Sequence, residues 1–147
     1  PEPTGVVGIV SPDSPELRGM VSLIASTRLT GNTAVVIVSK TASLSAISLA
    51  EALATSDLPG GVVNLLTGVR GELAPWLANH MDVNAIIDAS GDSNILETFE
   101  SGAADNLKRV WDHSFTSRED WFEETACNPY RILDVTETKT AWHPIGS

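Results

Sequence analysis

The chain has 147 residues, enough for one folded domain, and 42% of them are hydrophobic, which argues against intrinsic disorder. Its net charge is −10, and residues 81–147 contain five Lys or Arg against thirteen Asp or Glu. Because nucleic acids and anionic membrane surfaces bind clusters of basic residues, we expect neither as a partner.

The single cysteine, Cys127, excludes an intrachain disulfide and a cysteine-rich zinc site. The sequence has no run of about 18 apolar residues and no signal peptide, so it predicts a cytoplasmic protein. Because the first residue is Pro1 and not methionine, we also expect a piece of a longer protein.

Four short apolar runs, rich in valine and isoleucine, recur along the first ninety residues. They span residues 6–10, 34–38, 62–66 and 83–87. Runs of this kind, without alternation of apolar and polar residues, are typical of strands buried on both faces. They predict a parallel sheet between two layers of helices.

Segments with helical spacing lie between and after these runs. The second of them begins near Ser43 and is expected to pack inward through Leu44 and Ile47. The third carries Trp76, which we expect in the core. A longer helix is expected over residues 93–111, after a turn that can cap it.

The alternation of strands and helices with short loops predicts βαβ crossovers. The fold class is therefore α/β, with a Rossmann-like parallel sheet over residues 1–111 and an acidic connector over 112–128. In the remaining residues, 129–147, the segment from Tyr130 to Thr140 alternates and predicts a C-terminal extension strand. Such a strand must pair with a sheet edge, in this chain or in another, and we expect another chain.

Several blocks resemble the NAD-binding half of aldehyde dehydrogenases. They are residues 5–12, 31–36, 49–51, 58–68 and 103–110. The sequence Leu-Pro-Gly-Gly-Val-Val-Asn, followed by Thr-Gly, is specific to that superfamily. The tail, residues 139–146, resembles the closing strand of some members. The resemblance implies a fold that binds NAD or NADP and a tail that extends an intersubunit sheet.

The resemblance also shows where the cofactor positions differ. In place of the lysine that binds the adenosine ribose the chain has Ile37, and Lys40 replaces the glutamate. At the turn that faces the pyrophosphate, Asp88 and Asp92 add negative charge, which opposes phosphate binding. We therefore expect no useful affinity for NAD or NADP. The vestigial cofactor-binding positions are Ser14, Ser39, Lys40, Gly68, Ser90 and Gly91.

The catalytic positions of the superfamily are replaced in the same way. Ser14 stands where an asparagine amide donates to the oxyanion, and His113 stands where a glutamate is the general base. Cys127 lacks the Gly-Gln-x-Cys setting of the nucleophile, and we expect no catalytic domain in this chain. Cys127 and His113 as thiol and base are the alternative interpretation. We expect no catalytic residue in this chain.

These observations predict a truncated, non-catalytic aldehyde dehydrogenase-like module that docks on a complete aldehyde dehydrogenase catalytic module or forms a homo-oligomer. Some members of the superfamily have an incomplete second module, which this chain resembles. Two alternatives stay open. The chain could still bind a nucleotide as a sensor or half-site, or be the NAD(P)-binding part of an oxidoreductase whose catalytic residues lie on another chain.

Overall fold

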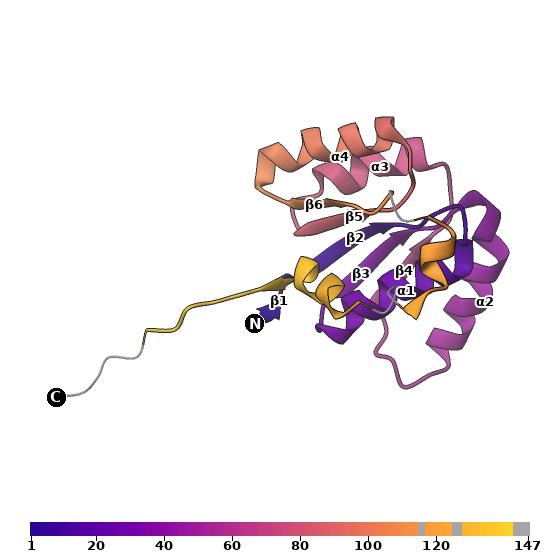
Figure 1. Cartoon of the computed structure of the whole chain (residues 1–147), viewed down its shortest axis with the longest axis horizontal. Helices are drawn as coiled ribbons and strands as arrows, with labels where there is room; N and C mark the ends of the chain where they lie inside the picture. The colour runs from indigo at the N-terminus through magenta and orange to yellow at the C-terminus, as the bar shows by residue number, and fades with distance from the viewer. Residues whose placement is uncertain (115–116, 125–127, 143–147) are drawn as a thin grey trace.

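The chain begins its five-stranded sheet in the middle and not at an edge (Figure 1). The computed structural model describes residues 1–114, 117–124 and 128–142. The strands are parallel, in the order β4-β3-β2-β5-β6, and comprise β2 (Val6–Val10), β3 (Thr33–Ile37), β4 (Val63–Leu66), β5 (Ala85–Asp88) and β6 (Arg109–Asp112). The chain builds one half of the sheet outward from β2, crosses back and builds the other half from β5. The predicted α/β class with a Rossmann-like parallel sheet is confirmed.

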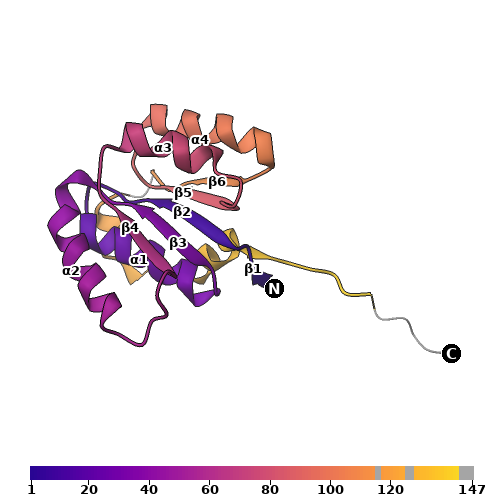
Figure 2. The same ribbon diagram turned by 180° about the vertical axis from the view of Figure 1, so that it is seen from behind.

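Two layers of helices cover the sheet, one on each face (Figures 1 and 2). One layer contains α1 (Glu16–Leu29) and α2 (Ser43–Ala54), and the other contains α3 (Arg70–Asn79) and α4 (Ser93–Asn106). In the part of the chain that the structure describes, no helix combines the length and the apolar composition that a membrane crossing needs.

Both faces of the central strands are buried, as the sequence predicts. Val7 and Ile9 of β2 pack in the apolar layer under α1, whereas Val10 packs with Phe99 of α4 in the opposite layer. Gly8, between them, lies so close to α3 that a Cβ there would be 2.8 Å from a methyl carbon of Leu77. The valine-rich runs are therefore strands because each of their faces has a helical layer to pack against.

The segment after residue 112 folds back onto α1. Trp121, the last residue of the 3₁₀ helix η2 (Glu119–Trp121), is 1% exposed, and Val135 is fully buried in the same apolar layer. The side-chain amide of Asn32 donates to the backbone oxygen of Val135 over 2.7 Å. The segments around Trp121 and Val135 thus share the core of the sheet domain.

The helix predicted over residues 93–111 is too long. α4 ends at Asn106, because Leu107 adopts the left-handed conformation with φ of 57°. The next residues form β6, which pairs in parallel with β5. The ladder with β5 satisfies backbone groups that a longer helix would have bonded internally, so pairing between distant residues overrides the local helical signal.

The C-terminal strand predicted from Tyr130 to Thr140 is also mostly wrong. Pro129–Val135 forms a 3₁₀ helix, η4, which begins at Asn128, whose side chain accepts from the Tyr130 amide over 2.9 Å. The strand that follows, β7 (Thr136–Glu137), pairs antiparallel with β1 (Glu2–Pro3) of the same chain. Beyond β7 the chain runs away from the body of the molecule as an extended arm (Figures 1 and 2).

Three apolar side chains expected in the core are exposed. In α2, Leu44 is 82% exposed and Ile47 is 49% exposed, and Ala46 is the residue that the helix buries. In α3, Trp76 is 79% exposed. The helices turn other residues toward the strands, since α2 buries Ala46 and α3 buries Ala74, Leu77 and Ala78.

Candidate functional site

The carboxyl ends of the parallel strands form the candidate site. In open α/β sheets, ligands bind outside these ends, where the chain leaves neighbouring strands toward opposite faces. Here β2 leads to α1 on one face, and its neighbour β5 leads to α4 on the other. At this edge lie the loop residues Ser11, Asp13, Ser14, Ser39, Gly68, Ser90 and Gly91, together with Lys40 at the start of a 3₁₀ helix, Arg70 at the start of α3 and Asp88 at the end of β5.

A two-point ion pair crosses this edge. Arg70, the first residue of α3, contacts both carboxylate oxygens of Asp13, with Nη2 2.9 Å from Oδ1 and Nη1 3.1 Å from Oδ2. Arg70 also donates to the backbone oxygen of Ser11. The Arg70 side chain is 16% exposed and that of Asp13 is 58% exposed. This fork connects the loop after β2 to the start of α3.

Two buried serines hold the carboxylate of Asp13 in place. The Ser39 hydroxyl donates to Asp13 Oδ1 over 2.6 Å, and the Ser39 amide donates to the Ser11 hydroxyl over 2.7 Å. Partial burial opposes ionisation of Asp13. The bonds from Ser39 and Arg70 outweigh it, so the pKa of the carboxyl lies below its usual value. The expected cofactor residue Ser39 therefore has its hydroxyl committed to Asp13.

A cavity of about 440 Å³ lies beside the ion pair, lined by Asp13, Lys40, Ser43, Gly68, Val69 and Arg70. It brings together two of the expected cofactor positions, Lys40 and Gly68, because they follow the neighbouring strands β3 and β4. Ile37, at the position of the ribose-binding lysine, is 1% exposed and packs in the core. Ser14 is exposed in the loop before α1 and does not line this cavity.

The expected phosphate positions lie at the start of α4. Asp88, at the end of β5, is 2% exposed and accepts from the Ser90 amide over 2.9 Å. Burial raises the pKa of the Asp88 carboxyl above its usual value. Gly91 has a φ of 72°, and Asp92 caps α4 by accepting from the Asn94 amide over 2.9 Å. Carboxylates thus occupy the surroundings of Ser90 and Gly91.

His113, at the position of the general base, contacts a carboxylate of η4. Its Nε2 lies 3.3 Å from Oδ2 of Asp134 in η4, and the two side chains are 10% and 21% exposed. Burial lowers the pKa of His113 and raises the pKa of Asp134. Cys127, the other half of the alternative thiol–base pair, lies outside the described residues. Among the residues described, no three His, Cys, Asp or Glu side chains gather as metal ligands.

The sequence analysis assigns no role to Arg70. One signal was available. A basic residue in the first turn of a helix opposes the helix dipole, so its presence there indicates a nearby carboxylate partner. Which carboxylate it pairs with depends on the sheet order, because Asp13 and Arg70 are 57 residues apart.

Comparison with known proteins identifies the family to which this fold belongs. The model of the aldehyde dehydrogenase family matches residues 1–112. The chain belongs to this family. It is 30% identical over 110 residues to the NADP/NAD-dependent aldehyde dehydrogenase PuuC of Escherichia coli K12, covering 75% of this chain and 22% of the relative. It is 33% identical over 110 residues to an aldehyde dehydrogenase of Enchytraeus buchholzi, covering 74% and 22%.

Solved aldehyde dehydrogenases share the fold of the same region. The enzyme from Bartonella henselae has a TM-score of 0.69 and 31% identity, over 76% of this chain and 23% of its own. An indole-3-acetaldehyde dehydrogenase complexed with NAD⁺ has a TM-score of 0.70 and 32% identity, over 76% and 22%. The chain therefore spans less than a quarter of the length of these relatives. The family match ends before Trp121 and Asp134.

Proposed function

We propose that this chain is a non-catalytic aldehyde dehydrogenase-like module with a structural, docking or oligomerisation role beside a complete aldehyde dehydrogenase. The observation that carries the proposal is the two-point ion pair between Asp13 and Arg70 at the carboxyl ends of the strands. The family fold is retained, while the edge at which this fold binds ligands is bridged by the chain's own side chains.

The charges at this edge support the proposal. A dinucleotide brings two phosphates, which need amide or cationic donors. Here Arg70 is already neutralised by Asp13, and the start of α4 is capped by Asp92. Ile37 offers no hydrogen bond to a ribose. The residues at this site therefore fit NAD or NADP poorly, and we assign no reaction step to a cofactor.

A second function has its own supporting observation. The 440 Å³ cavity beside Lys40 and Gly68 lies where an α/β sheet binds ligands. The similar indole-3-acetaldehyde dehydrogenase is an NAD⁺ complex. These features favour the alternative that the chain is the NAD(P)-binding part of an oxidoreductase whose catalytic residues lie on another module or chain.

Calorimetric titration of NAD and NADP distinguishes the two proposals. We expect no measurable binding at micromolar concentration and no NADH production from simple aldehydes, with a complete aldehyde dehydrogenase as positive control. Asp13→Asn removes the carboxylate and leaves the Arg70 cation for a phosphate, so it should raise NAD affinity about fivefold or more. Asp57→Asn, in an exposed loop, makes the same change of charge and should not. A micromolar dissociation constant in the unaltered chain would favour the second function.

A further inference from the structure

The β6 strand presents an open edge of the sheet. Among the residues that the structure describes, β6 pairs with β5 on one side and with no strand on the other. The amides of Arg109 and His113 donate to backbone oxygens on the β5 side, over 3.3 Å and 2.7 Å. Because a strand directs alternate residues to its two sides, the amide and carbonyl groups of Val110 and Asp112 point outward. Such an edge can accept a further strand.

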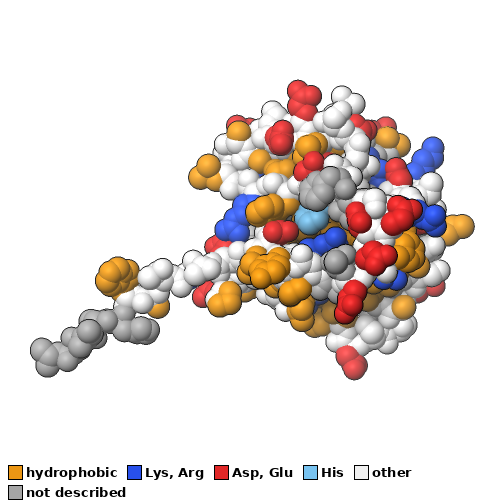
Figure 3. Space-filling model, viewed as in Figure 1, with side chains coloured by type: hydrophobic (Ala, Val, Ile, Leu, Met, Phe, Trp, Pro, Cys, Tyr) orange, Lys and Arg blue, Asp and Glu red, His pale blue; other side chains and the backbone are white. Residues whose placement is uncertain are grey.

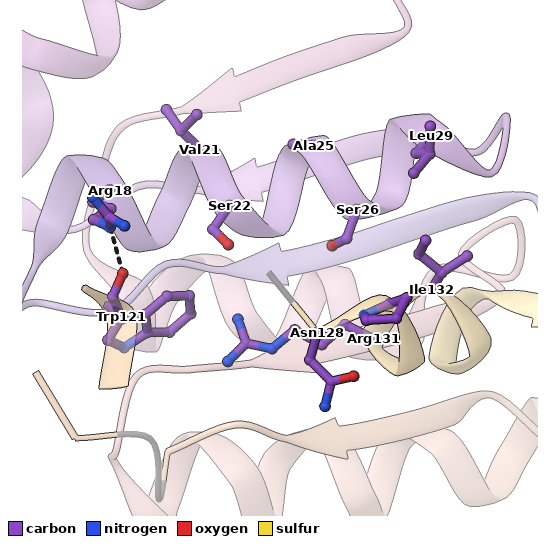
Figure 4. A pocket seen from close by; sticks show the side chains of 11 residues that line it. Arg18, Val21, Ser22, Ala25, Ser26, Leu29, Trp121, Asn128, Arg131 and Ile132 are labelled. Carbon is purple, nitrogen blue, oxygen red and sulfur yellow. Dashed lines mark hydrogen bonds between the residues drawn. The ribbon is translucent and has the colours of Figure 1, made fainter. Parts of the chain in front are cut away.

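The same chain carries an extended segment that can serve as this strand. Residues 138–142 form no helix or strand, and all of them are exposed on the arm after β7 (Figures 1 and 2). The root of the arm is fixed to the body, because Val135 is fully buried and Ile132 of η4 faces Leu29 of α1 (Figure 4). The arm therefore stands clear of a body that holds its root in place.

We infer that the partner of this edge is a second copy of the chain, with the arm of each copy added antiparallel to β6 of the other. This inference rests on the oligomerisation role proposed above. Lys139 is the single charged residue of the arm, whereas residues 81–147 contain five Lys or Arg against thirteen Asp or Glu. The arm is thus attracted to the acidic half of another copy, although two such halves repel each other.

The position of the root selects β6 over the other edge of the sheet. Nη2 of Arg109 lies 3.2 Å from Oε1 of Glu137, and Nη1 donates to the Thr136 backbone oxygen over 3.1 Å. The root thus lies beside β6, whereas β4 is four strands away, roughly 19 Å across the sheet. Five extended residues span only about 17 Å. A two-fold axis near the root brings each arm to the β6 of the other copy.

One antiparallel register matches the side chains on the face toward α4. With Lys139 opposite Asp112, Ala141 lies opposite Val110, and both pairs use the outward backbone groups of β6. Lys139 gains a carboxylate partner, and the half-buried Val110 gains a small apolar neighbour. In the single chain Lys139 pairs with Glu2, but both side chains are exposed, so exchanging this ion pair costs little.

The same register matches the side chains on the opposite face. Trp142 lies opposite Arg109, and Thr140 lies opposite Trp111, which is 38% exposed. The edge of the Arg109 guanidinium is bonded to β7, and the side chain is 40% exposed, so its flat face can stack on the indole ring of Trp142. The exposed aromatic side chain of the arm thus has an acceptor in the other copy.

Sedimentation velocity of the whole chain over a series of concentrations measures the dissociation constant of the dimer. Ala141→Pro removes the arm amide that pairs with Val110 and should weaken association at least tenfold. Thr140→Pro is the matched control, because the Thr140 amide points away from β6 in this register, and it should weaken association less than about threefold. Both substitutions lie in the exposed arm, so neither should change the melting temperature.

A charge exchange tests the contact between Lys139 and Asp112. Lys139→Asp and Asp112→Lys each place like charges opposite one another, and each should weaken association about 5- to 30-fold. The double variant restores opposite charges in reverse order and should return to within about threefold of the unaltered chain. Asp57→Lys, in an exposed loop, makes the same change of net charge as Asp112→Lys and should not weaken association.

The two proline variants keep the test decisive if Asp112→Lys fails to fold, because they leave the body of the molecule unaltered. Equal effects of the two prolines, or no recovery in the double variant, would overturn the pairing of the arm with β6. A chain that is monomeric at high concentration would overturn the inference, and its binding to a complete aldehyde dehydrogenase instead would identify that enzyme as the partner. NAD titration tests the non-catalytic role separately, so the two failures are distinguishable.

Discussion

Asp13 shows how the partners of one carboxylate decide the chemistry of its surroundings. Alone, a carboxylate at this edge would repel a phosphate. Together with Arg70 and Ser39 it forms a bonded set that occupies donors of these two side chains. Ser11 and Ser39 are both fully buried, and the hydrogen bond between them fixes the geometry of this set. Asp13, Arg70, Ser39 and Ser11 therefore form one connected set of hydrogen bonds at this edge.

His113 allows a prediction for pH dependence. Burial, assisted by Arg131, lowers its pKa below 6.5 despite the opposing carboxylates of Asp134 and Asp112. The unfolded chain then binds more protons than the folded chain just below pH 6.5. We expect the free energy of unfolding to fall as the pH decreases from about 7 to about 5.5.

Urea denaturation across this range, in the unaltered chain and in His113→Gln, measures the effect. The variant should show a flatter dependence on pH, whereas His80→Gln, which removes an exposed histidine, should keep the original slope. The raised pKa of Asp134 acts in the opposite direction, because a carboxyl that binds its proton more tightly when folded gains stability toward acid. A slope that is unchanged in His113→Gln would show that burial of this histidine does not govern acid stability.

At the scale of elements, the contact between α3 and α4 depends on a missing side chain. A Cβ at Gly102 of α4 would lie 2.9 Å from the Cβ of Ala78 and 3.1 Å from its backbone carbonyl atoms. Because this neighbour is backbone, it cannot move aside without shifting α3.

We expect Gly102→Ala to lower the free energy of unfolding by about 1–3 kcal/mol, because overpacking outweighs the helical preference of alanine. Gly71→Ala in α3 is the matched control, since its Cβ would meet nothing within 4 Å. That substitution should raise stability by roughly 0.5–1 kcal/mol. Thermal or urea unfolding measures both, and equal effects of the two substitutions would contradict the close contact of the helices.

The elements that the sequence predicts correctly are those with a local signal. Apolar β-branched runs identify β2, β3 and β5, since strands inside a parallel sheet need such residues on both faces. The run at β4 also forms a strand, but its residues alternate between half-buried and exposed because β4 lies at the edge of the sheet. β6 has no such run, and it is a strand because β5 lies beside it. For η4, the alternation of residues 130–140 favours a strand. The cap at Asn128 and the proline at the first helical position override that pattern.

In the candidate site, too, some contacts could be predicted from the sequence and others depend on residues far apart in the chain. Lys40 and Gly68 come together because they follow neighbouring strands, which the sequence order and the Rossmann-like fold make predictable. The contact between His113 and Asp134 could not be predicted, because it requires residues 129–135 to fold back as a 3₁₀ helix.

At the scale of the whole molecule, the arm after β7 is the feature best suited to assembly. It continues from the two-stranded sheet of β1 and β7 and stands clear of the body (Figure 3). Trp142 on this arm is 91% exposed, and Lys139 forms an ion pair with Glu2 near the other end of the chain. An extended segment that carries an exposed aromatic side chain can add to the sheet of a partner.

The last prediction is that removal of residues 138–147 converts an oligomer of the chain into a monomer without loss of folding. The cut after Glu137 preserves β7, the buried Val135 and its bond from Asn32, so the melting temperature should change little. A cut after Asn128 is the contrasting variant, because it removes η4 and Val135 from the core and should unfold the domain. Trp142→Ser should weaken association without affecting the fold. Light scattering coupled to size-exclusion chromatography measures the mass of each form, and a full-length chain that is monomeric at high concentration would show that the arm does not join copies of this chain.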